Sequence, residues 1–190
     1  ASKLNVPRIG VRFRLPASMN QVEYFGRGPA ENYLDRNAGS MIGLYKSTAE
    51  ELYFPYVRPQ ENGHHTDTRW VSLSTGKKGL LIQADNTIGF NALRNSIEDF
   101  DDEEATGLSR QWSNFTPEQV ANHDEAAAKN VLRRQHHIND ITPCDFVEVC
   151  VDLKQQGVAG YDSWGSRPEP AYTLPANREY NWGFTLIPLK

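Results

Sequence analysis

The sequence has few cysteines and no long apolar run. Cys144 and Cys150 are the only two cysteines among 190 residues. If the segment between them is extended, at roughly 3.3 Å per residue, they lie far beyond the reach of a disulfide. We therefore expect two free thiols, which say little about the compartment. No segment approaches the roughly 20 apolar residues of a membrane-spanning helix, and the first residues lack the apolar stretch of a signal peptide.

The sequence also lacks an excess of basic charge, since the formal net charge is −4, and its arginines are dispersed. A nucleic-acid-binding domain usually carries a basic face. We therefore predict no nucleic-acid partner and no membrane partner. The sequence begins without methionine and enters a strand pattern almost at once, which we interpret as the start of a piece of a longer chain.

Alternation of apolar and polar residues predicts a series of short strands. In residues 8–15, apolar side chains at every second position alternate with arginines, as in a half-buried antiparallel strand. In residues 146–154, valines alternate in the same way with Glu148 and Asp152. Further strands are predicted at 20–28, 39–47, 67–75, 79–85 and 178–189, separated by turn residues. This regular spacing predicts an all-β sandwich.

One region departs from the strand pattern. Residues 116–140 are predicted to be helical, since Thr116 is a suitable N-cap and Pro117 fits the first turn. The preceding acidic run, residues 97–107, is either a solvated loop or a cation site. It lacks the glycine and terminal glutamate spacing of an EF-hand, so we assign no metal ligand.

The residues alone show no standard catalytic motif. There is no nucleophile elbow and no glycine-rich phosphate loop, and spacing cannot pair the scattered carboxylates. The histidine pairs His64–His65 and His136–His137 consist of neighbours that point apart on a strand or a helix. Neither pair can therefore coordinate one metal ion without further ligands. Proton transfer on a sugar hydroxyl by a lone histidine acting with a carboxylate remains an open possibility.

Three stretches combine glycines with polar and aromatic residues: FGRGPAENYLDR (25–36), PYVRPQENGHHTD (55–67) and GVAGYDSWGS (157–166). Amides, carboxylates and guanidinium groups beside aromatic rings can bind sugar hydroxyls. The same side chains can also satisfy the backbone of turns. Trp164, in the third stretch, is either a flat platform for a ligand or a plug at the edge of the sandwich.

In this order and at these spacings, the three motifs resemble the C-terminal small-chain domain (domain 5) of glycoside hydrolase family 2 β-galactosidases. The family pattern is Gly-x-Gly-Pro-x-Glu-Asn-Tyr-x-Asp-Arg, then Tyr-x-x-Pro-x-Glu-Asn-Gly, then Gly-x-Gly-Gly-x-Asp-Ser-Trp. Both ends of the chain fit the same domain. Ala159 stands where the family usually has glycine and Leu34 where it often has proline, and residues 91–112 form a longer stretch than the family pattern has.

The resemblance implies a galactose mutarotase-like β-supersandwich with a helical and acidic insertion around residues 95–140. Residues 1–190 are expected to form most of a single β-sandwich domain that lacks its first strands. The parent enzyme is expected to cleave terminal β-galactosides such as lactose with retention, in carbohydrate metabolism. Its two catalytic carboxylates would lie on a TIM-barrel domain outside this stretch. We therefore expect no catalytic residue here and an inactive isolated chain.

The resemblance also implies a role for the third motif, in which Trp164 stacks on the sugar beyond the galactose. The expected substrate-binding residues are Trp164, Asp162 and Ser163, with further polar sugar or loop contacts from Glu61, Asn62, Glu31 and Asn32. The expected partners are the β-galactoside, the TIM-barrel domain and further copies of the parent in a homo-oligomer. No cofactor is expected in this stretch, and a divalent cation such as Mg²⁺ is expected only in the parent. The compartment, cytoplasm or periplasm, stays open.

Two other functions remain open. The chain could be an aldose 1-epimerase-like enzyme that uses one of the four paired histidines with Glu61 or Glu31. It could also be a purely structural domain that completes a subunit interface.

Overall fold

The computed structural model describes residues 5–100, 138–162 and 166–190. Within these ranges the strands are β1 (Arg8–Pro16), β2 (Gln21–Gly28), β3 (Met41–Thr48), β4 (His65–Ser74), β5 (Gly79–Leu93), β6 (Phe146–Gln155) and β7 (Phe184–Leu189). Three short 3₁₀ helices accompany them: η1 (Ile97–Asp99), η2 (Ile138–Asp140) and η3 (Pro170–Tyr172). The predicted all-β class is confirmed, and this strand content is consistent with a β-sandwich.

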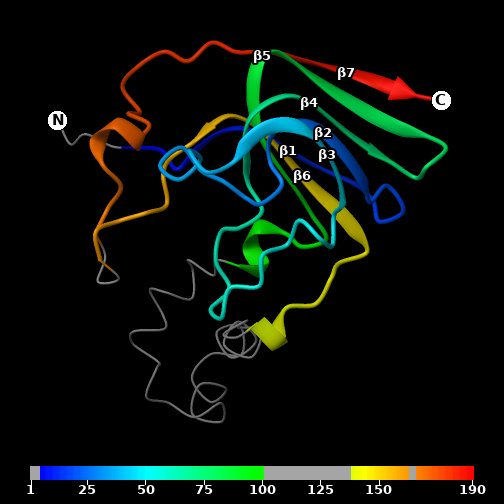
Figure 1. Cartoon of the computed structure of the whole chain (residues 1–190), viewed down its shortest axis with the longest axis horizontal. Coiled ribbons are helices and arrows are strands. Elements are labelled where there is room, and N and C mark those ends of the chain that lie inside the picture. Colours follow the sequence, from blue (N-terminus) through cyan, green and yellow to red (C-terminus); the bar gives the residue numbers. More distant parts are fainter. Residues whose placement is uncertain (1–4, 101–137, 163–165) are drawn as a thin grey trace, which may run out of the picture. The chain divides into compact units, whose positions relative to one another are not determined.

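The strands form one antiparallel sheet in the order β1-β6-β5-β4-β2-β3, and β7 pairs with β5 (Figure 1). The long strand β5 organises this sheet. Its residues 79–83 pair with both β4 and β7, and its residues 89–93 pair with β6. Strand β5 therefore joins the two halves of the sheet.

The chain divides into two compact units. The first contains residues 1–54, 62–94 and 144–190 and holds every strand named above. The second contains residues 55–61 and 95–143, including η1 and η2. Within the second unit, the Asn95 amide donates to Thr142 O (2.9 Å) and the Ser96 N–H donates to Asp99 Oδ2 (2.8 Å). The predicted helix at 116–140 lies outside the described residues, except for its last three, which form η2.

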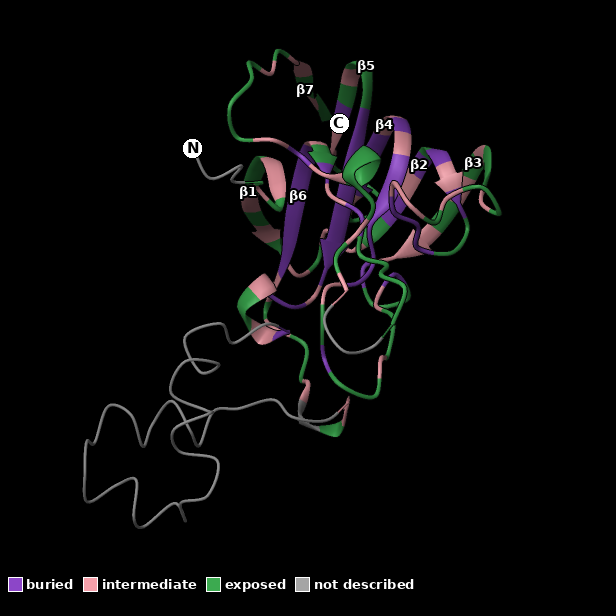
Figure 2. Ribbon diagram, turned by 90° about the vertical axis from the view of Figure 1, so that its left-hand side faces the viewer, coloured by how far each residue is buried: buried purple, intermediate pink, exposed green. Residues whose placement is uncertain are grey.

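One side of the first unit's sheet carries the apolar core. Its central side chains are fully buried: Tyr24, Val71, Ile82, Phe90 and Val149. Figure 2 shows this burial along β2, β4, β5 and β6. The Tyr24 ring meets the Phe90 ring edge-on with centroids 5.1 Å apart, a geometry that aromatic pairs favour. The alternation of apolar residues at every second position therefore produces the core.

The structure corrects three details of the strand prediction. Strand β5 continues to Leu93, well beyond the predicted end at residue 85. Strand β7 begins only at Phe184, so residues 178–183 are not part of it. The polar side of β6 is not solvated, because Glu148 and Asp152 are buried. The expectation of two free thiols is confirmed, with Cys150 buried and Cys144 half-buried.

Candidate functional site

A buried polar cluster occupies the side of β6 that carries Asp152. Asp152 pairs across the sheet with Gly10 of β1 and with Gly89 of β5. A Cβ atom at Gly10 would overlap Asp152 Oδ1, and one at Gly89 would lie 2.5 Å from the His64 ring. The two glycines thus leave the space into which the Asp152 carboxylate and the His64 imidazole fit.

Arg8 neutralises this buried carboxylate. Its Nε lies 3.0 Å from Asp152 Oδ2, and its guanidinium also donates to Asn91 Oδ1 (2.8 Å) and to the Gln155 side chain. His64 Nδ1 lies 2.8 Å from the same Asn91 oxygen. A buried charge is tolerated when it is paired with an opposite charge and hydrogen-bonded. The cluster therefore ties β1, β5 and β6 together below the surface.

His64 and His65 are each only 1% exposed. Burial, with the positive charge of Arg8 as a further cause, lowers the pKa of His64 to about 3. Burial likewise lowers the pKa of His65 to about 4, against an opposing effect of its contact with Arg27 O. Both imidazoles are therefore neutral at physiological pH, and neither is presented to solvent as a general acid or base.

The predicted polar contacts of the first motif lie inside the fold. Glu31 is 9% exposed, and its carboxylate accepts from the Gly63 N–H (2.5 Å) and from Arg36 (2.6 Å). Asn32 is fully buried and accepts from the Thr66 N–H (2.9 Å) while donating to backbone carbonyls. Both side chains therefore hold the first motif against the segment that leads into β4.

The second motif divides between the two units. Asn62 belongs to the first unit and is 2% exposed; its Oδ1 accepts from the Phe54 N–H (3.1 Å). Asn62 O also accepts from the Asn91 side chain (2.7 Å). Glu61 belongs to the second unit and is half-buried. The geometry thus brings Asn62 into the framework of the buried cluster.

The glycine-rich loop after β6 is anchored by the first motif. Asp35 Oδ2 accepts from the Ala159 N–H at 2.7 Å, and a Cβ atom at Gly157 would overlap the same carboxylate. The Gly157 N–H in turn donates to Tyr172 O (2.8 Å). Glycine at 157 therefore permits the close approach of Asp35 that fixes the start of the loop.

The far end of the loop returns close to its start. A Cβ atom at Gly160 would overlap Ser166 O, and the Ser166 N–H donates to Asp162 Oδ1 (3.4 Å). Asp162 itself is exposed. The predicted substrate-binding residues Ser163 and Trp164 lie outside the described residues. The structure therefore describes the frame of this loop, residues 157–162 and 166, on either side of those positions.

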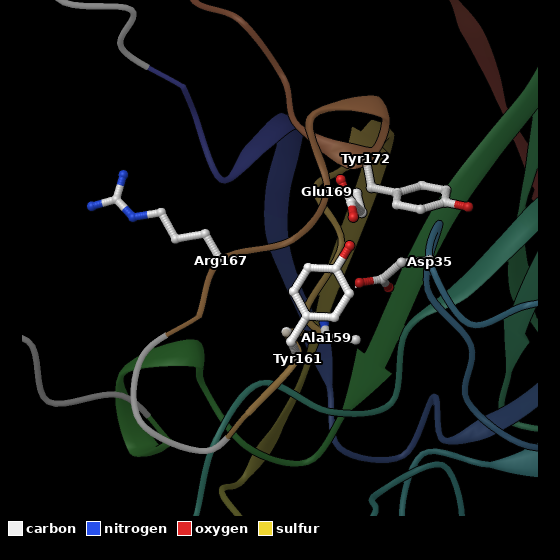
Figure 3. A pocket seen from close by; sticks show the side chains of 7 residues that line it. Asp35, Ala159, Tyr161, Arg167, Glu169 and Tyr172 are labelled. Atoms are coloured by element: carbon white, nitrogen blue, oxygen red, sulfur yellow. The ribbon is translucent and has the colours of Figure 1, made fainter.

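A hollow of about 160 Å³ opens beside this frame. It is lined by Asp35, Ala159, Gly160, Tyr161, Arg167, Glu169 and Tyr172. Figure 3 shows the Tyr161 ring next to the carboxylates of Asp35 and Glu169, whereas the Arg167 guanidinium points away from them. Tyr161 is 83% exposed. Flat rings beside hydrogen-bond acceptors suit a ligand that is apolar on its faces and rich in hydroxyls at its edges.

Sequence reasoning missed the partners of this hollow. Asp35 and Ala159 are 124 positions apart, so spacing could not join them. Tyr172 and Glu169 lie at η3, outside the three motifs. The one available signal was Tyr161, an aromatic residue within the glycine-rich stretch.

The described residues contain neither a metal-binding cluster nor a membrane-spanning helix. No group of three or more His, Cys, Asp or Glu side chains is arranged to hold a metal ion in the described part of the chain. Among the same residues, no helix has the length and apolar character needed to cross a membrane.

The fold and the site define an all-β domain in which a glycine-rich loop, anchored on the half-buried Asp35, borders a hollow of tyrosines and carboxylates. The chain belongs to the β-galactosidase small-chain family, whose sequence model matches residues 1–186. It is 35% identical over 185 residues to a β-galactosidase of Priestia megaterium, covering 97% of this chain and 15% of that protein. It is 29% identical over 181 residues to a β-galactosidase of Vibrio cholerae, covering 95% of this chain and 14% of that protein.

A third relative, a β-galactosidase from an Arthrobacter species, is 41% identical over 99 residues, which are 49% of this chain and 10% of the relative. The chain thus spans about 15% or less of the length of these relatives. It corresponds to a small part of each of them.

Proposed function

We propose that this chain is a domain of a glycoside hydrolase family 2 β-galactosidase that hydrolyses terminal β-D-galactosides such as lactose with retention. The observation that carries the proposal is the family match over residues 1–186, together with relatives named β-galactosidase. Retention requires two carboxyl groups about 5–5.5 Å apart on either side of the scissile bond. In this proposal both belong to the TIM-barrel domain of the parent, so the isolated chain is inactive.

The contribution of this domain is the loop of residues 157–166. Trp164 stacks on the sugar beyond the galactose, and Asp162 and Ser163 border the same position. The anchoring of Ala159 by Asp35 and the close approach of Gly160 to Ser166 support this role, because a binding loop must be held on a rigid frame. Asp162, which accepts from Ser166, is both part of that frame and next to Ser163.

The size of the effect follows from the area that an indole ring covers. Burying roughly 100 Å² at about 25 cal/mol per Å² gives on the order of 2 kcal/mol. That corresponds to roughly a 30-fold change in affinity. Such a contact governs the preference for the leaving group or the acceptor sugar, and it leaves bond cleavage to the carboxylates of the parent.

The remaining partners belong to the same proposal. The domain packs on the TIM-barrel domain of the parent, which forms a homo-oligomer and takes a divalent cation such as Mg²⁺ near its catalytic carboxylates. Glu61, Asn62, Glu31 and Asn32 hold loops in place. Three of these side chains are buried and bonded to backbone groups, which supports this part of the proposal.

The epimerase alternative has no support from the first unit. His64 and His65 are buried, with pKa values lowered to about 3 and 4. An epimerase needs a histidine that reaches the sugar and exchanges a proton near neutral pH. His136 and His137 lie outside the described residues.

The test compares wild type and Trp164→Ala in the full-length protein that contains this chain. We expect kcat/KM for lactose to fall by roughly 30-fold, while an aryl β-galactoside with a good leaving group is cleaved nearly as before. Phe184→Leu, an apolar change in strand β7 away from the loop, is the control. Equal losses for both substrates, or a loss of thermal stability alone, would assign Trp164 a structural role.

A further inference from the structure

The hollow beside the loop has features that the proposed role of Trp164 does not use. Tyr161 is 83% exposed and Tyr172 is 37% exposed, so two rings border the same small space. Exposed aromatic rings grouped around a concavity are typical of binding sites rather than of solvated surface. The hollow therefore suits a ligand with an apolar face.

Asp35 supplies a polar group that is directed toward this ligand. Its Oδ2 atom accepts from the Ala159 N–H, whereas its Oδ1 atom is buried and has no hydrogen-bond partner among the described residues. Figure 3 shows this carboxylate facing Tyr161 and Glu169. A buried acceptor without a donor is unfavourable, and its negative charge beside the hollow favours a ligand that donates hydrogen bonds.

The charges around the hollow restrict the class of ligand. Two carboxylates, Asp35 and Glu169, face the space, and the Arg167 guanidinium points away from it. Two carboxylates beside the hollow favour a neutral ligand that donates from its hydroxyls, and they repel phosphates and carboxylates. A volume of about 160 Å³ is also below the roughly 300–1,000 Å³ of pockets for drug-sized ligands, so it suits one ring.

We propose that this hollow is a second carbohydrate-binding site, which takes one pyranose ring on Tyr161 and binds its hydroxyls with the exposed Glu169 carboxylate, beside the negative charge of Asp35. The inference rests on the proposed function for the kind of sugar, since it assigns a further sugar contact to the same domain. It uses different side chains from the Trp164 contact, so the two contacts can be removed separately.

The experiment titrates glucose into the full-length protein in the Trp164→Ala background, with ligand-observed NMR as the readout. In that background the contact proposed for Trp164 is absent. Adding Tyr161→Ala is expected to weaken the remaining glucose binding by about tenfold, because the ring covers part of one sugar face. Adding Glu169→Gln is expected to weaken it by roughly threefold, because one oxygen acceptor becomes an amide donor.

Tyr180→Ala is the matched control, because Tyr180 lies in the segment before β7 and does not line the hollow. It should leave glucose binding unchanged, and inorganic phosphate should not compete with glucose. Tyr161 is largely exposed, so its truncation should leave the thermal unfolding midpoint unchanged.

The outcomes separate this inference from the proposed function. If Tyr161→Ala leaves glucose binding as it was, if phosphate competes, or if the variant only loses stability, the second site is refuted. If Tyr161→Ala weakens glucose binding while Trp164→Ala has no effect on lactose cleavage, the second site stands and the role of Trp164 fails.

Discussion

Replacing Arg8 by leucine should destabilise the edge of the sheet far more than the same change at Arg12. Arg8 Nε lies 3.0 Å from Asp152 Oδ2, and the two side chains are 17% and 1% exposed. Removing one partner of a buried ion pair costs about 3–5 kcal/mol, because the other charge stays buried. Each 1.4 kcal/mol is a factor of ten, so the protection of nearby amides should fall by about two to three and a half orders of magnitude.

The assay is amide hydrogen exchange of β1 and β6 in the full-length protein, which reports local opening. Arg12→Leu is the matched control on the same strand, since Arg12 is 43% exposed and lies 3.5 Å from Glu148. Glu148 is buried but keeps Arg14 as a second counter-ion at 3.1 Å when Arg12 is removed, so exchange should change by less than tenfold. Equal effects of the two variants would refute the account of Arg8 as the counter-ion of a buried carboxylate.

Three further predictions follow from the same geometry. Gly10→Ala should destabilise the domain by about 1–3 kcal/mol in chemical denaturation, because the new Cβ would lie 2.6 Å from Val151 O; an unchanged midpoint would contradict this crowding. The pKa of His65 is lowered to about 4 from 6.5, so the unfolded state binds its proton first and stability falls as pH drops from 6.5 toward 4. His65→Phe should reduce the loss of unfolding free energy between pH 6.5 and 5 by roughly 2 kcal/mol, as measured by thermal unfolding. An unchanged pH dependence in this variant would assign the loss to other groups. Asp35→Asn should speed hydrogen exchange at Ala159 by about tenfold, because the 2.7 Å bond loses its charge, whereas β2 amides should be unaffected.

Most of the fold was predictable because side-chain alternation records which face of a strand is buried. The predicted strands at 8–15, 20–28, 39–47 and 146–154 match β1, β2, β3 and β6 to within two residues at each end. The extension of β5 was missed because Asp85 and Asn86 are typical turn residues. In the structure β5 runs through them, and the register of the β4–β5 pair shifts nearby.

The buried polar cluster was not predictable from periodicity. Asp152 alternates with valines as a solvent-facing residue would, and only its cross-strand neighbours Gly10 and Gly89 reveal the space it occupies. Those neighbours come from two other strands, β1 and β5. Sheet register is therefore the information that the linear pattern lacks.

The candidate site was predictable in part. The glycine-rich stretch was predicted to be a binding loop from its resemblance to the family motif, since Trp164 by itself left a plug at the edge of the sandwich open. The anchor of this loop was not predicted, because Asp35 and Ala159 are 124 positions apart in the sequence. The hollow at Tyr161 depends on η3, whose residues carry no motif of their own.

The central claim is that this domain places a sugar-binding loop beside the active site of a β-galactosidase. The most direct measurement is the partition of the galactosyl group between water and added glucose, in wild-type and Trp164→Ala full-length protein. The account predicts that transfer to glucose falls by roughly 30-fold, while release of the aryl group from an aryl β-galactoside changes by less than about threefold. Unchanged transfer to glucose in a correctly folded Trp164→Ala protein would contradict it.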